Sequence, residues 1–124
     1  MRRWFALCLA ALLAGCHRGT PAGPAPAMRY TEVGLEVENH YWGDVRIYVL
    51  HDGVAERIGM VSAASDASFV LPGRFFLSGG PIRLRAWPVA SPTSFTSEAI
   101  QVLPDQLIVW TLETQLERSS VMLR

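Results

Sequence analysis

Thr31 to Glu38, which reads TEVGLEVE, is the stretch that decides the fold of this chain. Apolar side chains recur at every second position, and glutamates occupy most of the positions between them. The apolar set is Val33, Leu35 and Val37, and the acidic set is Glu32, Glu36 and Glu38. Because successive side chains of a β-strand point to opposite faces, this alternation predicts a half-buried strand.

The alternation resumes after a turn at residues 39–44 (NHYWGD). Val45 to His51 is predicted to be the next strand, and Asp52-Gly53 supplies the residues that a two-residue hairpin needs at positive φ. The resulting register pairs Tyr48 with Arg57 on the outer face and, on the inner face, Ile47 with Ile58, Val45 with Met60 and Val49 with Glu56. A glutamate fits an inner face poorly, so a longer loop, a β-bulge or an exposed sheet end is expected there.

Further short strands are predicted along the rest of the chain, namely Ala67 to Leu71, Pro81 to Trp87, Phe95 to Val102, Leu107 to Glu113 and Ser119 to Leu123. The apolar phase slips within the third of these, which predicts a bulge near Ser97 to Ala99. The apolar run Phe75-Phe76-Leu77 lies in no strand and is expected to plug one end of the core.

The spacing of these strands favours one architecture. No window longer than about ten residues shows a helical period of 3.6 with caps. Seven to eight short strands separated by turns predict an all-β fold, an antiparallel β-sandwich of immunoglobulin-like arrangement. A small closed β-barrel is the alternative.

The amino-terminal segment has the layout of a secretory signal peptide. Met1-Arg2-Arg3 is positively charged, Trp4 to Leu13 is mostly apolar, and small residues follow. The uncharged run from Trp4 to Cys16 has thirteen residues, whereas a spanning helix needs about 20. A permanent transmembrane anchor is therefore not expected.

Leu13-Ala14-Gly15-Cys16 resembles the lipobox of bacterial lipoproteins. The resemblance implies cleavage between Gly15 and Cys16, a diacylglyceryl thioether on Cys16 and an acylated amino terminus. The alternative is a plain secreted protein in which Cys16 is incidental. His17 stands where lipoproteins of the inner membrane often carry Asp, so the resemblance implies the outer membrane, facing the periplasm or the cell surface.

Three segments follow from these features. Residues 1–15 are the expected signal peptide, residues 16–28 the lipidated cysteine and a tether rich in Pro, Ala and Gly, and residues 29–124 one β-sandwich domain. The tether cannot bury enough apolar surface to order itself. Cys8 leaves with the signal and Cys16 carries lipid, so the domain is expected to have no disulfide.

Charge and motif content argue against several functions. The chain has no lysine, and beyond Arg2 and Arg3 nine arginines face eleven carboxylates, so nucleic acid is not an expected partner. His17, His40 and His51 lack metal-ligand spacing, and no phosphate-binding glycine loop or nucleophile motif occurs. No metal, no cofactor and no catalytic residue is expected, so the protein is predicted not to be an enzyme.

Arginine and aromatic residues on the predicted strands form the candidate interaction surface: Trp42, Arg46, Tyr48, Arg57, Arg83, Arg85 and Trp87. Arg, Trp and Tyr are enriched where interfaces concentrate their binding energy, although a solvated sheet face is the alternative. Tyr41-Trp42 in the first turn is either a binding loop or a cap on the sandwich.

These observations together predict a non-enzymatic, lipid-anchored protein of the bacterial cell envelope. Its partners are expected to be membrane lipid, bound through Cys16, and an envelope protein bound by the sandwich. A module that binds a small ligand or a glycan through Trp42, Trp87 and the arginines is the alternative. The body also loosely resembles small β-sandwich lipoproteins without an assigned activity.

Overall fold

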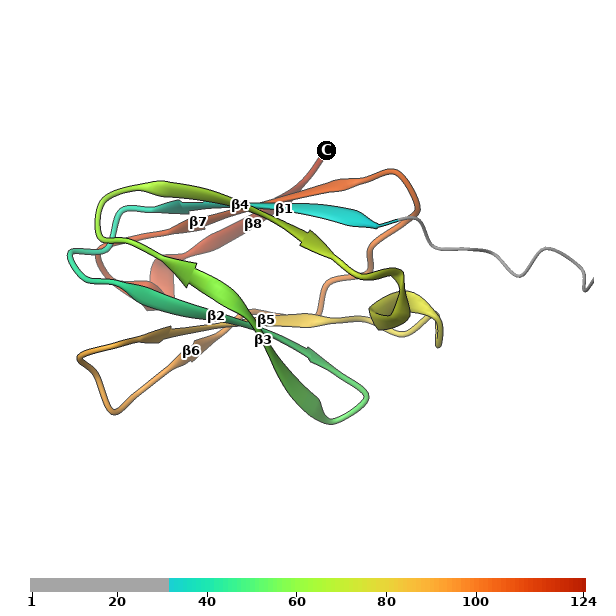
Figure 1. The fold of residues 1–124 in the computed structure, drawn as a ribbon, viewed down its shortest axis with the longest axis horizontal. Coiled ribbons are helices and arrows are strands. Elements are labelled where there is room, and N and C mark those ends of the chain that lie inside the picture. Colours follow the sequence, from blue (N-terminus) through green and yellow to red (C-terminus); the bar gives the residue numbers. More distant parts are fainter. Residues whose placement is uncertain (1–31) are drawn as a thin grey trace, which may run out of the picture.

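The computed structural model describes residues 32–124, and the predicted signal peptide, the predicted lipid-attachment residue Cys16 and the predicted tether lie outside this range. The described residues form eight strands in two facing four-stranded sheets (Figure 1). They contain no helix long and apolar enough to cross a membrane. The predicted β-sandwich is confirmed, whereas the alternative of a closed barrel is not observed for these residues.

The first sheet, here called the β1 sheet, has the order β4-β1-β7-β8. Its strands are β1 (Val33–Asn39), β4 (Asp66–Leu71), β7 (Leu107–Leu112) and β8 (Ser120–Leu123). The second, the β2 sheet, has the order β3-β2-β5-β6. Its strands are β2 (Val45–His51), β3 (Val54–Val61), β5 (Arg83–Pro88) and β6 (Phe95–Thr96). Two short 3₁₀ turns are η1 (Gly73–Phe76) and η2 (Leu116–Arg118).

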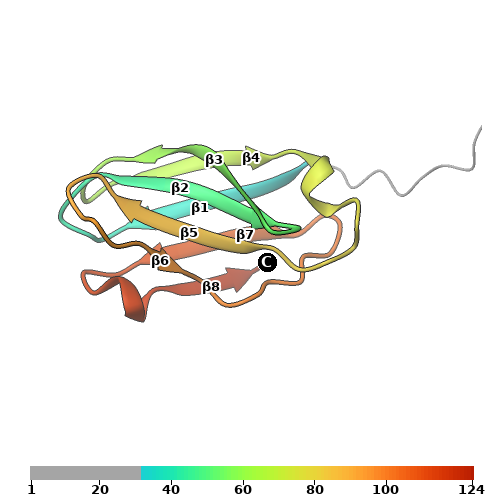
Figure 2. The same cartoon turned by 90° about the horizontal axis from the view of Figure 1, so that it is seen from below.

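Strand pairing departs from a purely antiparallel scheme at one place. β1 pairs with β7 in parallel, and the other strand pairs are antiparallel. An immunoglobulin constant-type domain keeps its first two strands in one sheet. Here β1 and β2 lie in opposite sheets, so the chain crosses between the layers at its first turn (Figure 2). The two-layer architecture is as expected, and the strand order is particular to this chain.

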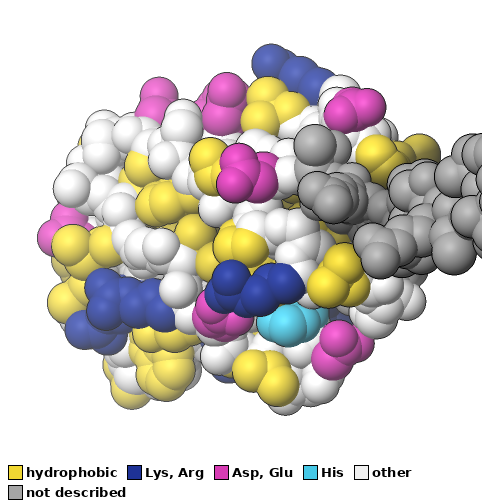
Figure 3. All heavy atoms as spheres, turned by 45° about the vertical axis from the view of Figure 1, so that its right-hand side comes forward, with side chains coloured by type: hydrophobic (Ala, Val, Ile, Leu, Met, Phe, Trp, Pro, Cys, Tyr) yellow, Lys and Arg dark blue, Asp and Glu magenta, His cyan; other side chains and the backbone are white. Residues whose placement is uncertain are grey.

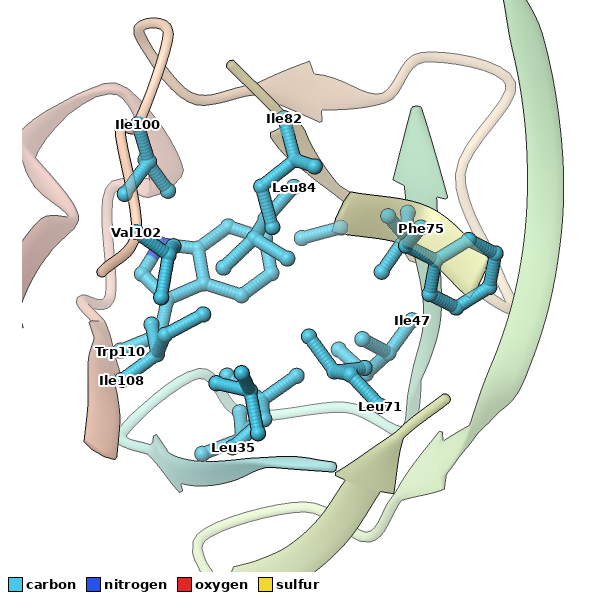
Figure 4. Close-up of a cluster of buried hydrophobic side chains, with 14 of the residues drawn as sticks. Leu35, Ile47, Leu71, Phe75, Ile82, Leu84, Ile100, Val102, Ile108 and Trp110 are labelled. Carbon is cyan, nitrogen blue, oxygen red and sulfur yellow. The ribbon is translucent and has the colours of Figure 1, made fainter. Parts of the chain in front are cut away.

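The core lies between the sheets, where the inward positions of the strands meet (Figure 4). The predicted inward residues of β1, β2, β5 and β7 are all buried, and Trp110 is the largest of them. Phe75 and Phe76 of η1 are buried and close one end of the core, as predicted. The prediction for Leu77 is wrong, because the chain leaves the core after η1 and this side chain is 67% exposed.

The β2–β3 hairpin has the predicted pairs Tyr48–Arg57 and Val49–Glu56, but the other two predicted pairs are wrong. A bulge at Ile47/Tyr48 shifts the register, so that Ile47 pairs with Gly59 and Val45 with Val61. Ile58 is the additional residue, and Gly59 leaves room for the ring of Phe69. As a consequence Met60 lies on the outer face, opposite Arg46.

The predicted strand from Phe95 to Val102 is interrupted. β6 contains only Phe95 and Thr96, and Ile100 rejoins the sheet through a single bridge to Ile82. The interruption falls at Ser97 to Ala99, where the bulge was predicted. Ser97 is buried there because its Oγ accepts a hydrogen bond from the amide of Leu84 (2.9 Å).

Candidate functional site

Six of the seven predicted surface residues lie together on the outer face of the β2 sheet. We call this surface the arginine face and define it by Arg46, Arg57, Arg83, Arg85, Tyr48, Trp87 and Met60. The face exists because the inward neighbours of these residues are buried core positions, which leaves the alternate positions outward. Sequence patterning missed only Met60, since the bulge that turns it outward was not placed.

Cross-strand pairing arranges the face in rows. One row crosses four strands as Arg57, Tyr48, Arg85 and Thr96. A second row consists of Met60, Arg46 and Trp87. Tyr48 therefore lies between Arg57 and Arg85. Side chains at such directly paired positions are close enough to interact.

Local contacts fix several side chains of the arginine face. The Nε of Arg85 donates a hydrogen bond to Oγ1 of Thr96 (3.2 Å), and the indole Nε1 of Trp87 donates to the carbonyl of Ser91 (3.0 Å). The rings of Tyr48 and Trp87 lie 6.4 Å apart between centroids, within the range of an aromatic pair. The two rings thus form an aromatic pair between the arginines, and the hydrogen bond to Ser91 fixes the orientation of Trp87.

None of the four arginines of this face forms an ion pair within residues 32–124. This is notable because the same residues contain seven arginines and eleven carboxylates. Arg74, outside the face, does pair with Glu56. The arginine face is thus a concentrated positive surface on a body that is acidic elsewhere.

Trp42 is not part of the arginine face. It lies in the β1–β2 loop at an end of the sandwich and is 67% exposed. Tyr41 packs against the core, and its ring centroid is 5.1 Å from that of Trp42. Asn39, which is buried, holds the loop by donating from Nδ2 to the carbonyls of Gly43 (3.1 Å) and Ser62 (2.9 Å). The turn therefore both caps the core and leaves one tryptophan in solvent.

A hollow of about 540 Å³ opens between the edge strands β6 and β8. Its lining is mixed. Phe95, Ile100, Val121 and Leu123 contribute apolar surface, and serines together with Glu98 and Glu117 contribute polar surface. No histidine or arginine lines it. The hollow therefore offers both apolar contact and hydrogen-bonding groups to a bound molecule.

A small charged cluster occupies the end of the β2–β3 hairpin. Nδ1 of His51 lies 3.7 Å from Oδ2 of Asp52, and Nε2 of His51 lies 3.8 Å from Oε2 of Glu56. Arg74 also forms an ion pair with Glu56. The His51 ring packs at 4.6 Å on Phe75 (centroid distance). Figure 3 shows the end of the sandwich where acidic, arginine and histidine side chains gather among apolar ones.

This cluster explains the position of Glu56 opposite Val49. Glu56 lies at an exposed end of the sheet, which is one of the alternatives that the sequence predicts, and it has Arg74 as a basic partner. Among residues 32–124 no group of three or more His, Cys, Asp or Glu side chains is arranged to hold a metal ion. The Arg74–Glu56 pair of the cluster links η1 to the end of the β2–β3 hairpin.

Comparison with known proteins identifies no family for this chain. No protein-family model matches the sequence, and no curated protein sequence matches it. Among solved structures, the chain is similar to an NMR structure of a protein from Eubacterium rectale, with 13% identity and a TM-score of 0.46. The similarity covers 81% of this chain and 93% of that one. A likeness at this level does not bear on function.

Proposed function

We propose that this protein is a lipoprotein of the bacterial cell envelope, anchored through Cys16, whose β-sandwich binds a protein partner through the arginine face without catalysing a reaction. The observation that carries the proposal is the group of four arginines that form no ion pair within residues 32–124 and lie around Tyr48 and Trp87 on one sheet.

The chemistry of the face suits protein recognition. A guanidinium presents up to five donors in a fixed plane and binds carboxylates in a bidentate manner. Tyr, Trp and Arg are the residues most enriched among binding hot spots. Because the side chains stand on paired strands rather than on a loop, binding requires little ordering of the backbone.

The anchor and the envelope location are supported by the sequence alone. Residues 1–16 combine a charged start, a short apolar core and the Leu13-Ala14-Gly15-Cys16 pattern, and residues 17–28 form a proline-rich tether. Two or more acyl chains hold a protein firmly at a membrane, at about 0.8 kcal/mol for each buried methylene. The arginine face would then be presented to proteins close to the membrane surface.

The proposal is tested by cross-linking in intact cells, with a photoreactive residue in place of Met60, an exposed position on the arginine face. The wild type is compared with Cys16→Ser and with the double variant Arg57→Ser/Arg83→Ser, which alters two exposed arginines. Arg118→Glu is the control, because it changes the net charge equally and lies in η2, away from this face.

We expect a protein adduct in the wild type and the control, and its loss in the double variant. Mass spectrometry of the amino-terminal peptide reports the lipid on Cys16. Equal adducts in the double variant and the control would refute the arginine face as the binding surface, and an unmodified Cys16 would refute the anchor.

The Tyr48–Trp87 ring pair also favours a second function, the binding of a small ligand or a glycan. Sugar or ligand rings stack on aromatic side chains, while the neighbouring arginines would contact acidic groups. A ligand screen read by tryptophan fluorescence and thermal shift tests this function. Trp87→Ala should abolish the response, and Trp42→Ala, which changes a tryptophan outside the face, should leave it intact.

A further inference from the structure

The outer face of the opposite sheet carries the complementary charge. Its outward positions include Glu36 and Glu38 of β1 and Asp66 of β4, which together we call the acidic face. Glu38 and Asp66 are direct cross-strand partners. None of the three forms an ion pair within the described residues. Arg124 lies at the far end of this sheet, where its backbone pairs with Leu107.

Like charges that face one another across a strand pair destabilise a sheet. Glu38 and Asp66 are in this situation. Within residues 32–124 a single side-chain hydrogen bond reaches this pair of carboxylates, from the hydroxyl of Thr111 to Oε2 of Glu38 (3.2 Å). On the other sheet Arg57 and Arg85 flank the same tyrosine. Each face therefore carries charges that an oppositely charged surface would compensate.

We propose that the arginine face binds the acidic face of a second copy of this chain, an inference that rests on the proposed function of the arginine face. The two faces lie on opposite sides of one sandwich, so a copy has one of each available (Figure 1). Contact between different patches on the two copies is a heterologous interface, which continues from copy to copy instead of closing at a dimer.

The size of the sheets sets the strength of this contact. Four strands spaced about 4.8 Å apart, with a mean length of about six residues at about 3.4 Å per residue, give a face of roughly 400 Å². Two copies would bury about 800 Å² in total, which belongs to the weak and transient class of interfaces. Anchoring all copies in one membrane would raise their effective concentration and favour the contact.

The test is sedimentation equilibrium of the full-length protein in a neutral detergent, at about 0.02 M and about 0.5 M salt, with Cys16→Ser as a second form to exclude association through micelles. Charges at the surface are screened within a few ångströms at the higher salt. We expect the average mass to rise with protein concentration at low salt and to remain that of a monomer at high salt.

Paired variants locate the contact. The variant Arg57→Ser/Arg83→Ser removes two charges from the arginine face, and Glu36→Gln/Asp66→Asn removes two from the acidic face. Arg118→Glu and Glu98→Arg are controls that change the net charge by the same amounts at exposed positions outside the strands. Each double variant should associate about five- to thirtyfold more weakly, as two exposed charge pairs of up to about 1 kcal/mol each imply, and the controls should match the wild type.

Mixing the two double variants provides the decisive measurement. Each variant keeps the face that the other has lost, so the mixture should form pairs of one copy of each and no larger species. Circular dichroism and unfolding midpoints establish that the variants fold.

Three results would overturn the inference: a monomer at all salt concentrations, controls that weaken as much as the double variants, or association that only the arginine variant weakens. The last result indicates that the arginine face contacts a different acidic patch of the second copy. In each case the adduct measured at Met60 in cells still decides the proposed function independently.

Discussion

Replacing Trp110 by alanine removes the largest fully buried side chain of the described core. Trp110 lies on β7, opposite Val37 of β1 and Val121 of β8, and is 0% exposed. Figure 4 shows Trp110 in the core between the sheets, in the same buried cluster as Leu84 of the other sheet. The side chain therefore connects the two layers, and its loss leaves a cavity between them.

The expected destabilisation of Trp110→Ala is about 3–5 kcal/mol, the range for large aromatic residues in cores. One feature moves the value toward the lower end. The buried Nε1 of Trp110 has no hydrogen-bond acceptor within residues 32–124, and an unsatisfied buried donor costs about 1–3 kcal/mol. The alanine variant is relieved of this cost. A domain has a total stability of about 5–15 kcal/mol, so the variant could lose most of its folded population.

Trp110→Phe separates the two contributions. Phenylalanine keeps most of the apolar volume and lacks the unsatisfied N–H group, so we expect a stability within about 1 kcal/mol of the wild type. Trp42→Ala is the matched control, because this tryptophan is 67% exposed and its removal should cost less than about 0.5 kcal/mol.

The measurement is equilibrium unfolding in urea, followed by far-ultraviolet circular dichroism so that the signal does not depend on tryptophan. For a domain of this size each kcal/mol also lowers Tm by about 4–8 °C, which gives an independent reading. A loss of stability below 1 kcal/mol for Trp110→Ala would refute the core position of Trp110. A loss for Trp42→Ala that equals the loss for Trp110→Ala would refute the distinction between a buried and an exposed tryptophan.

Two further predictions concern stability. Asn39→Ala should lower the free energy of unfolding by about 1–3 kcal/mol, because it removes two hydrogen bonds donated by a buried side chain and the acceptor of the Tyr41 amide. His40→Ala, at the exposed neighbouring position, should lower it by less than about 0.5 kcal/mol. Thermal unfolding compares the two variants, and equal losses would contradict the role of Asn39 in holding the β1–β2 loop. Gly59→Ala should lower the free energy of unfolding by about 1–3 kcal/mol, since the added Cβ would lie 2.5 Å from the ring of Phe69. The double variant Gly59→Ala/Phe69→Leu should recover part of the loss. An unchanged stability of Gly59→Ala would mean that the Phe69 ring does not lie against Gly59.

The candidate site shows how far residue patterns reach. Alternation along β2 and β5, together with the hairpin register that pairs Arg57 with Tyr48, indicated which arginine and aromatic residues point outward, and six of those residues do form one surface. The predicted hairpin joins only β2 and β3, and the pairing of β2 with β5 brings Arg83, Arg85 and Trp87 onto the same surface. Trp42 could not be placed, because a turn has no period and its side chains follow the contacts of Asn39 and Tyr41.

The sequence by itself determined the strands, their inward faces and the two-layer class of the fold. These are local properties, since a period of two depends only on neighbouring residues. The tertiary structure alone decided which strands are neighbours. It brings β1 beside β7 in parallel, with Glu38 and Thr111 in contact across 73 residues of chain. It also inserts the bulge that turns Met60 outward. Strand order and register depend on how apolar faces from distant parts of the chain pack together. The free energy of that packing depends on several segments at once, so the residue pattern of one segment does not predict it.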